Sequence, residues 1–147
     1  MKKFFTLIVA TLMASSMMAQ MHGAMTFAGP SSINVLTQNT GNACDTVRFE
    51  MASMSAGNIT LPVMQGMAAI PPFTIENVAF SKGENHVISI AEQTFTSKVT
   101  VNGEEKNIEG SSISGSYNMA DNSLTLKAVF KYGSMPFDLT YEVKAYY

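Results

Sequence analysis

Phe137-Asp138-Leu139-Thr140-Tyr141-Glu142-Val143-Lys144-Ala145-Tyr146-Tyr147 closes the sequence and alternates between apolar and polar side chains. One parity is apolar throughout, whereas the other carries Asp138, Thr140, Glu142 and Lys144. Because successive side chains of a strand point to opposite faces, this pattern predicts a strand with one buried and one solvent-facing side.

The same alternation extends upstream of this stretch. Residues 124–132 repeat it, and the turn-forming segment 132–136 joins them to the last strand, which predicts an antiparallel hairpin. Residues 112–119 supply a third strand, connected through the polar turn 120–123. The end of the chain is therefore expected to be a three-stranded meander.

Several shorter strands are expected before the meander. Asn102-Gly103 is a strong hairpin signal, since both central positions of the favoured two-residue turn need positive φ. Residues 57–72 hold several prolines and glycines and suit a broken edge strand or a loop across a barrel mouth. Residues 20–44 are interpreted as a polar lead-in with one strand near 33–37. The remaining strands are expected at 45–53, 73–80, 86–90, 94–101 and 106–110.

This organisation predicts an all-β fold, an antiparallel meander forming a barrel or a sandwich. A barrel is favoured because closure removes exposed strand edges. We expect a small, closed or partly open barrel of about eight strands, occupying residues 45–147.

The first 19 residues have the order of a secretory signal peptide. Lys2 and Lys3 precede an uncharged apolar run; small residues gather at 14–16, and Ala19 precedes Gln20. Cleavage is expected after Ala19 or, as second choice, after Ser16. The run is shorter than the roughly 20 residues of a membrane-spanning helix. No cysteine stands at the cleavage point, so we expect export to the periplasm, the cell surface or the exterior without a lipid anchor or a transmembrane segment.

Charge and cysteine content exclude further classes. Loss of Lys2 and Lys3 leaves 7 of the 9 basic residues against 11 acidic ones, and no basic patch typical of nucleic-acid binding is present. Cys44 is the sole cysteine, so an internal disulfide cannot form. We interpret Cys44 as a buried or idle thiol, because no histidine lies near it in sequence; pairing with another chain stays open.

No catalytic or metal site emerges from the sequence, and we expect neither an enzyme nor a cofactor. With only two histidines, His22 and His86, and no acidic pattern around either, a triad or a zinc site cannot be assembled. Methionine is abundant, and thioethers bind Cu(I). However, Met51 and Met54 would face opposite sides of one strand, so we interpret the methionines as flexible apolar filling.

The aromatic residues of the last three strands lie on the predicted buried parity. They are Tyr117, Phe130, Tyr132, Phe137, Tyr141 and Tyr147. An ordinary core accounts for them, and the alternative is an apolar ligand cavity with a few polar groups. In that alternative Met51, Tyr117, Phe130, Tyr132 and Tyr141 would line the barrel interior, and Tyr117 or Tyr141 would donate a hydroxyl to the ligand.

Three segments resemble a known family. They are 72–80 (PFTIENVAF), 122–126 (NSLTL) and 131–137 (KYGSMPF), in this order after a signal peptide. Over residues 45–147 the chain looks like the calycin-like secreted domains of diderm gut bacteria, distant relatives of the lipocalins. The resemblance implies an eight-stranded lipocalin-like barrel that binds a small apolar molecule. The lipocalin Gly-x-Trp signature is missing because the chain has no tryptophan, so no binding residue is carried over.

Two functions follow from these observations. The first is a non-catalytic binding module for a small apolar molecule or lipid in the barrel. The second is a structural or interaction protein of the envelope or cell surface, including an inhibitor of another protein; its expected sign is an exposed apolar patch or a free sheet edge.

Overall fold

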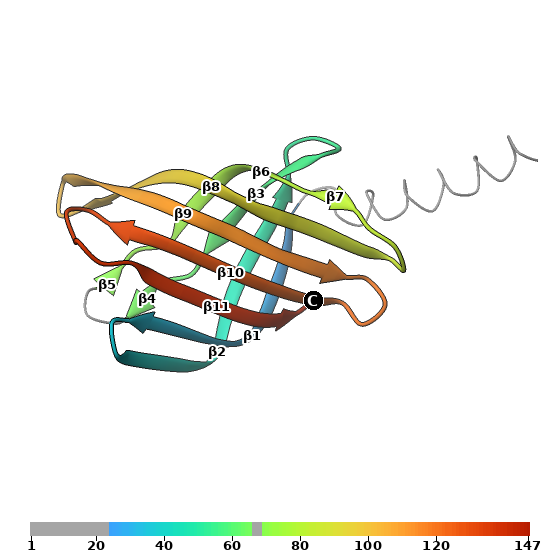
Figure 1. Ribbon diagram of the computed structural model, residues 1–147, viewed down its shortest axis with the longest axis horizontal. Helices are drawn as coiled ribbons and strands as arrows, with labels where there is room; N and C mark the ends of the chain where they lie inside the picture. Colours follow the sequence, from blue (N-terminus) through green and yellow to red (C-terminus); the bar gives the residue numbers. More distant parts are fainter. Residues whose placement is uncertain (1–23, 66–68) are drawn as a thin grey trace, which may run out of the picture.

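The computed structural model describes residues 24–65 and 69–147; the predicted signal peptide, residues 1–19, lies outside them. Within this part, strands and turns make up the fold without a helix, as Figure 1 shows. Nine strands form one antiparallel sheet in the order β6-β3-β2-β1-β11-β10-β9-β8-β7, which confirms the predicted meander. Its strands are β1 (Ala24–Val35), β2 (Gln38–Met51), β3 (Ala56–Leu61), β6 (Phe73–Ala79), β7 (Ser81–Lys82), β8 (Val87–Val101), β9 (Glu104–Asn118), β10 (Ser123–Tyr132) and β11 (Leu139–Tyr146). A separate hairpin consists of β4 (Met64–Gln65) and β5 (Ala69–Ile70).

The sheet rolls into a nearly closed barrel because β1 pairs with both β2 and the last strand, β11. Val35 lies opposite Leu139 at one end of the β1–β11 ladder, and Ala28 lies opposite Tyr146 at the other. One seam remains, between β6 and β8, which share no ladder. The barrel is thus the expected one, with β7 as a short addition beside β8.

Side chains bridge the seam where backbone pairing is missing. The Gln93 amide accepts a hydrogen bond from the Ala79 N–H and donates to the carbonyls of Ala79 and Ala91, each at 2.9 Å. Further along, the Ser97 hydroxyl donates to the Thr74 carbonyl at 2.7 Å. The β8–β9 register is irregular on both sides of Gln93, and such bulges re-aim a side chain. The Gln93 side chain therefore links β6 to β8 by hydrogen bonds.

Some strands are longer than the alternation predicts. The segments expected at 86–90 and 94–101 are joined in β8, and those expected at 106–110 and 112–119 are joined in β9. The irregular register near Gln93 shifts the parity and hides this continuity. Between them Asn102 and Gly103 have φ of 53° and 77°, which confirms the predicted turn.

The interpretation of residues 20–44 as a lead-in with one strand needs correction. This segment contains all of β1 and the first half of β2, so the described barrel wall includes Ala24 and does not begin at residue 45. Gly29-Pro30 interrupts the apolar alternation of β1, and the β1–β2 register shifts by one residue there. A strand split by such a bulge is hard to recognise from its pattern.

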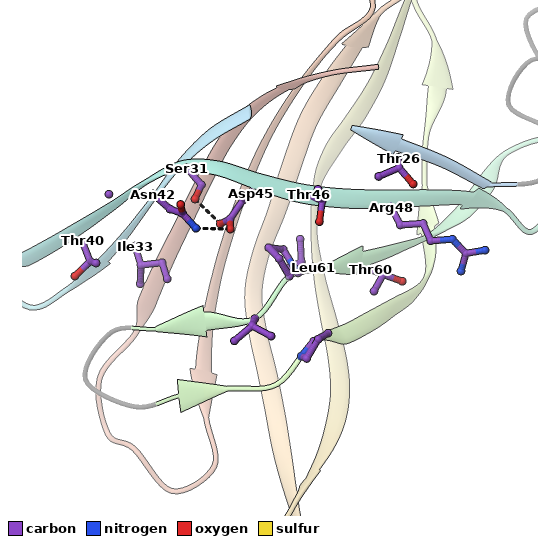
Figure 2. A pocket seen from close by; sticks show the side chains of 14 residues that line it. Thr26, Ser31, Ile33, Thr40, Asn42, Asp45, Thr46, Arg48, Thr60 and Leu61 are labelled. Carbon is purple, nitrogen blue, oxygen red and sulfur yellow. Dashed lines mark hydrogen bonds between the residues drawn. The ribbon is translucent and has the colours of Figure 1, made fainter. Parts of the chain in front are cut away.

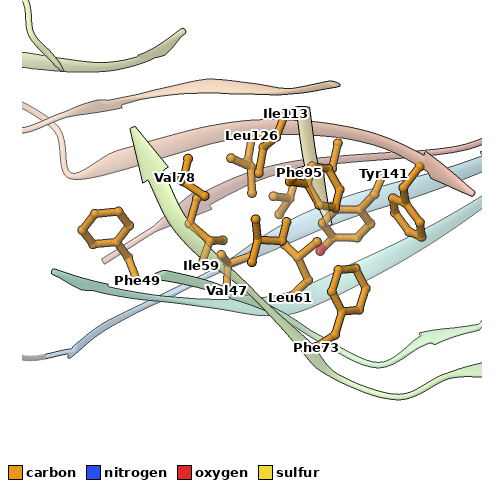
Figure 3. Packing of buried hydrophobic residues seen from close by; sticks show 14 of the residues in the cluster. Val47, Phe49, Ile59, Leu61, Phe73, Val78, Phe95, Ile113, Leu126 and Tyr141 are labelled. Atoms are coloured by element: carbon orange, nitrogen blue, oxygen red, sulfur yellow. The ribbon is translucent and has the colours of Figure 1, made fainter. Parts of the chain in front are cut away.

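The barrel interior is filled by side chains, as Figure 3 shows. Phe130 packs edge-to-face on Phe73 at 5.5 Å between ring centroids, and Phe27 packs on Tyr117 at 5.2 Å. Tyr147 was expected on the buried parity, but it is 67% exposed because it lies beyond the end of β11. Among the residues described, no helix has the length and apolar character needed to cross a bilayer.

Candidate functional site

The five side chains proposed to line a ligand cavity lie in or against the packed core. Tyr117, Phe130, Tyr132 and Tyr141 are buried, and Met51 packs half-buried at the end of β2. None of them lines any of four open cavities in the wall, of about 820, 720, 510 and 340 Å³. A ligand in contact with these side chains would have to displace neighbours in the core.

Both tyrosine hydroxyls proposed as ligand donors have internal partners. Tyr117 donates to Asn122 Oδ1 at 3.0 Å, and Tyr141 donates to Asp45 Oδ2 at 3.1 Å. Burial and the neighbouring Tyr147 raise the pKa of Tyr117. For Tyr141, burial and then the Asp45 carboxylate raise the pKa, so its hydroxyl remains a donor well above neutral pH.

The barrel wall has an opening where β3 leaves β2. The two strands pair from Met51 opposite Gly57 to Arg48 opposite Thr60. β3 then ends at Leu61 and Pro62 follows, and proline has no N–H with which to extend a ladder. Among the described residues, no strand pairs with β2 on this side between Gln38 and Val47. This segment is the free edge of β2.

A cavity of about 820 Å³ lies along this edge and is called the β2 groove below (Figure 2). Thr40, Asn42 and Asp45 line it from β2, and Leu61 and Pro62 line it from the other side. Polar side chains thus follow the edge strand while apolar groups lie opposite, a combination found in binding pockets.

Thr40 and Asn42 belong to the inner face of the sheet although they are exposed. Their cross-strand partners on β1, Ile33 and Ser31, are buried, and opposite residues of two paired strands share one face. The inner face of β2 is therefore reachable from solvent only where β3 no longer covers it.

Asp45 is the one charged residue in the buried set of the described chain, at 8% exposure. Ser31 donates to its Oδ2 at 2.5 Å, and Tyr141 donates to the same oxygen at 3.1 Å. Asn42 donates to Oδ1 at 2.6 Å, as Figure 2 shows together with the Ser31 bond. Three donors, from β1, β2 and β11, thus converge on a carboxylate at the wall of the groove.

A bulge in β2 places Asp45 in this position. Gly29 pairs with Asp45 but Ser31 pairs with Asn42, so β2 has one extra residue opposite Pro30. In the bulge the N–H of Cys44 donates to Asn42 Oδ1 at 3.3 Å. The extra residue returns Asp45 to the inner face, on the parity of Val47.

The other residues weighed from the sequence form no second site. Cys44 is exposed rather than buried. His86 is exposed in the turn before β8, and His22 lies outside the described residues. Met54 is exposed, away from the half-buried Met51. In residues 24–65 and 69–147 no three His, Cys, Asp or Glu side chains cluster as metal ligands would.

Comparisons with known proteins give one structural likeness. No protein-family model matches the chain, and no curated protein matches it. The crystal structure of a Bacteroides fragilis protein described as a "putative outer membrane protein" matches with a TM-score of 0.67 at 20% identity, over 84% of this chain and 50% of that one. The chain spans about half the length of that protein. At this identity the likeness shows a shared fold.

Sequence reasoning missed Asp45 and the free edge. Asp45 was assigned to the start of a strand, although it shares the parity of Val47, Phe49 and Met51. A carboxylate on an otherwise apolar parity is the signal that could have found it, since an unpaired buried charge is costly. Its partners Ser31 and Tyr141 lie 14 and 96 residues away in sequence, so pattern alone does not bring them together.

Proposed function

We propose that the protein is an exported, non-catalytic interaction protein of the cell envelope that binds an extended segment of a partner protein along the free edge of β2. The observation that carries this proposal is the run of β2 from Gln38 to Val47, which pairs with β1 on one side and, among the described residues, with no strand on the other, where a cavity of about 820 Å³ lies. A free sheet edge is the sign expected for an interaction protein. The signal-like residues 1–19 and the fold shared with a protein described as a "putative outer membrane protein" support an envelope location.

Strand addition supplies the physical basis of binding. Along an edge strand every second residue directs its N–H and C=O outward, and an extended segment can pair with these groups. Alternate side chains of the segment would then enter the β2 groove, where Leu61 and Pro62 offer apolar contact. The backbone pairs would give affinity and the groove would give specificity.

The seam between β6 and β8 is the alternative place at which a partner segment could add to the barrel. Cavities of about 720 and 340 Å³ lie along β6 and β8 there. However, Gln93 and Ser97 already link the two strands across the seam. A segment inserted between them would have to break these bonds, whereas the β2 edge needs no such rearrangement.

Binding of a small apolar molecule in the barrel interior stays a separate prediction, made from the family resemblance. Native mass spectrometry of protein purified from its own host tests it. A co-purifying apolar molecule would support that function, and a bare chain mass would count against it.

Selection from a displayed library of extended segments of about ten residues, the length of the free edge, tests the proposed function. Thr40→Tyr should block the groove, because Thr40 lies on the inner face of β2 and lines the cavity; its side chain is exposed, so the substitution leaves the fold intact. Thr100→Tyr, on the exposed side of β8 and away from the groove, is the matched control.

We expect the selected segments to bind the unaltered chain and the Thr100→Tyr variant equally. Thr40→Tyr should weaken binding by about tenfold or more, a loss of about 1.4 kcal/mol. Equal binding by Thr40→Tyr, or failure of the unaltered chain to select any segment, would refute the function.

A further inference from the structure

Among the residues that the structure describes, the Asp45 carboxylate has no positively charged partner. Its donors Ser31, Asn42 and Tyr141 are neutral side chains. Four ion pairs join described residues, and none includes Asp45. Arg48, the basic residue that lines the groove, is bonded to Glu50 at 3.1 Å. Buried charges in proteins are normally paired with an opposite charge. The Asp45 carboxylate is therefore an exception that a positively charged group of a partner could balance.

The hydrogen bonds leave one acceptor position on this carboxylate. The two oxygens of a carboxylate offer about four lone-pair positions. Ser31 and Tyr141 occupy two on Oδ2, and Asn42 occupies one on Oδ1. The remaining position belongs to Oδ1, so one further donor can bind there.

Strand addition would bring a side chain of the partner segment to this oxygen. Asp45 lies on the inner face of β2, as does Val47. A residue opposite Asp45 on an added strand shares this face, with its Cβ about 4.5–5.5 Å from that of Asp45. A long basic side chain at this position reaches the free position of Oδ1.

We propose that the β2 groove selects an extended partner segment with a lysine opposite Asp45. Lysine fits better than arginine because arginine binds a carboxylate best through two parallel bonds, and Oδ2 is already occupied by two donors. An ammonium group needs one acceptor and a negative charge, which the groove supplies. This inference rests on the proposed function, in that it names the chemistry of the segment bound there.

The inference is tested with one extended segment selected from the displayed library. This segment is synthesised with a lysine at each position in turn, and the affinity of each version for the chain is measured. Versions with arginine or norleucine at the preferred position are compared on the unaltered chain, a comparison that does not depend on any variant folding. Asp45→Asn then removes the charge while keeping the shape of the side chain. Glu92→Gln, an exposed carboxylate on β8 outside the groove, is the matched control.

We expect one position at which lysine binds about tenfold or more tightly than norleucine, as befits a bond to a charged group. Asp45→Asn should abolish this preference, and Glu92→Gln should keep it. A segment that binds in the groove without any lysine preference, or a preference that survives Asp45→Asn, would overturn the inference and leave the proposed function standing. Binding that is insensitive to Thr40→Tyr would instead remove the proposed function and, with it, this inference.

Discussion

Replacement of Gln93 by alanine should open the barrel seam. The substitution removes three hydrogen bonds of 2.9 Å and leaves the N–H and C=O of Ala79 without their partner. A net hydrogen bond contributes about 0.5–1.5 kcal/mol to stability. Ala79 is exposed, so water can form hydrogen bonds with its N–H and C=O in the variant. We therefore take the lower limit of this range for each of the three bonds. We expect the free energy of unfolding to fall by about 1.5 kcal/mol.

Urea denaturation measures the loss, and amide hydrogen exchange locates it. In Gln93→Ala the Ala79 amide should lose its protection, while core amides of β10 should change only with global stability. Gln93→Glu is a sharper probe, since it keeps an acceptor for the Ala79 N–H but sets a carboxylate against the carbonyls of Ala79 and Ala91. That variant should protect the Ala79 amide and still be destabilised.

Ser97→Ala serves as the control for this prediction, because it removes a seam bond to Thr74 without touching Ala79. An unchanged urea midpoint and undiminished protection of the Ala79 amide in Gln93→Ala would refute the role of Gln93 in linking β6 to β8.

Two further predictions concern packing and one concerns pH. Phe130→Ala should cost about 3–5 kcal/mol in urea unfolding, since the ring is fully buried; a loss below 1 kcal/mol would argue for a loose interior. Gly110→Ala should cost about 1–3 kcal/mol, because its Cβ would clash with the Phe95 ring, and Phe95→Leu should restore part of the loss. Above about pH 10, unfolded Tyr141 ionises while the folded residue, its pKa raised by burial and Asp45, keeps its proton. Stability should therefore fall there by about 1.4 kcal/mol per pH unit from this group, and Tyr141→Phe should show a correspondingly smaller slope.

Much of the wall could be predicted from period-two alternation. The β10–β11 hairpin and the Asn102-Gly103 turn follow the sequence pattern closely, with Phe130 opposite Leu139 in the observed register. In these strands one face is buried and the other is in solvent, so the chemical contrast between alternate residues is strong.

Alternation fails where a strand is bulged. The strand expected near 33–37 covers only the end of β1, because Gly29-Pro30 breaks the pattern before it; β8 is expected as two strands because its register is irregular around Gln93. A bulge adds a residue and reverses the parity beyond it, so each half resembles a separate short strand.

The candidate site depends on the path of the chain in space. Pro62 gave the sequence cue that β3 is interrupted, but the free edge exists because β2 continues beyond that point. The partners of Asp45 come from β1, from the bulged half of β2 and from β11, and only barrel closure brings Ser31 and Tyr141 beside it. No local pattern carries such information.

Amide hydrogen exchange of β2, measured with and without a selected extended segment, tests the central claim most directly. Strand addition predicts slower exchange at alternate residues between Gln38 and Val47, because those amides gain partners, and little change at the seam residue Ala79. Unchanged exchange along β2 in the presence of a bound segment, or slowing confined to β6 and β8, would contradict it.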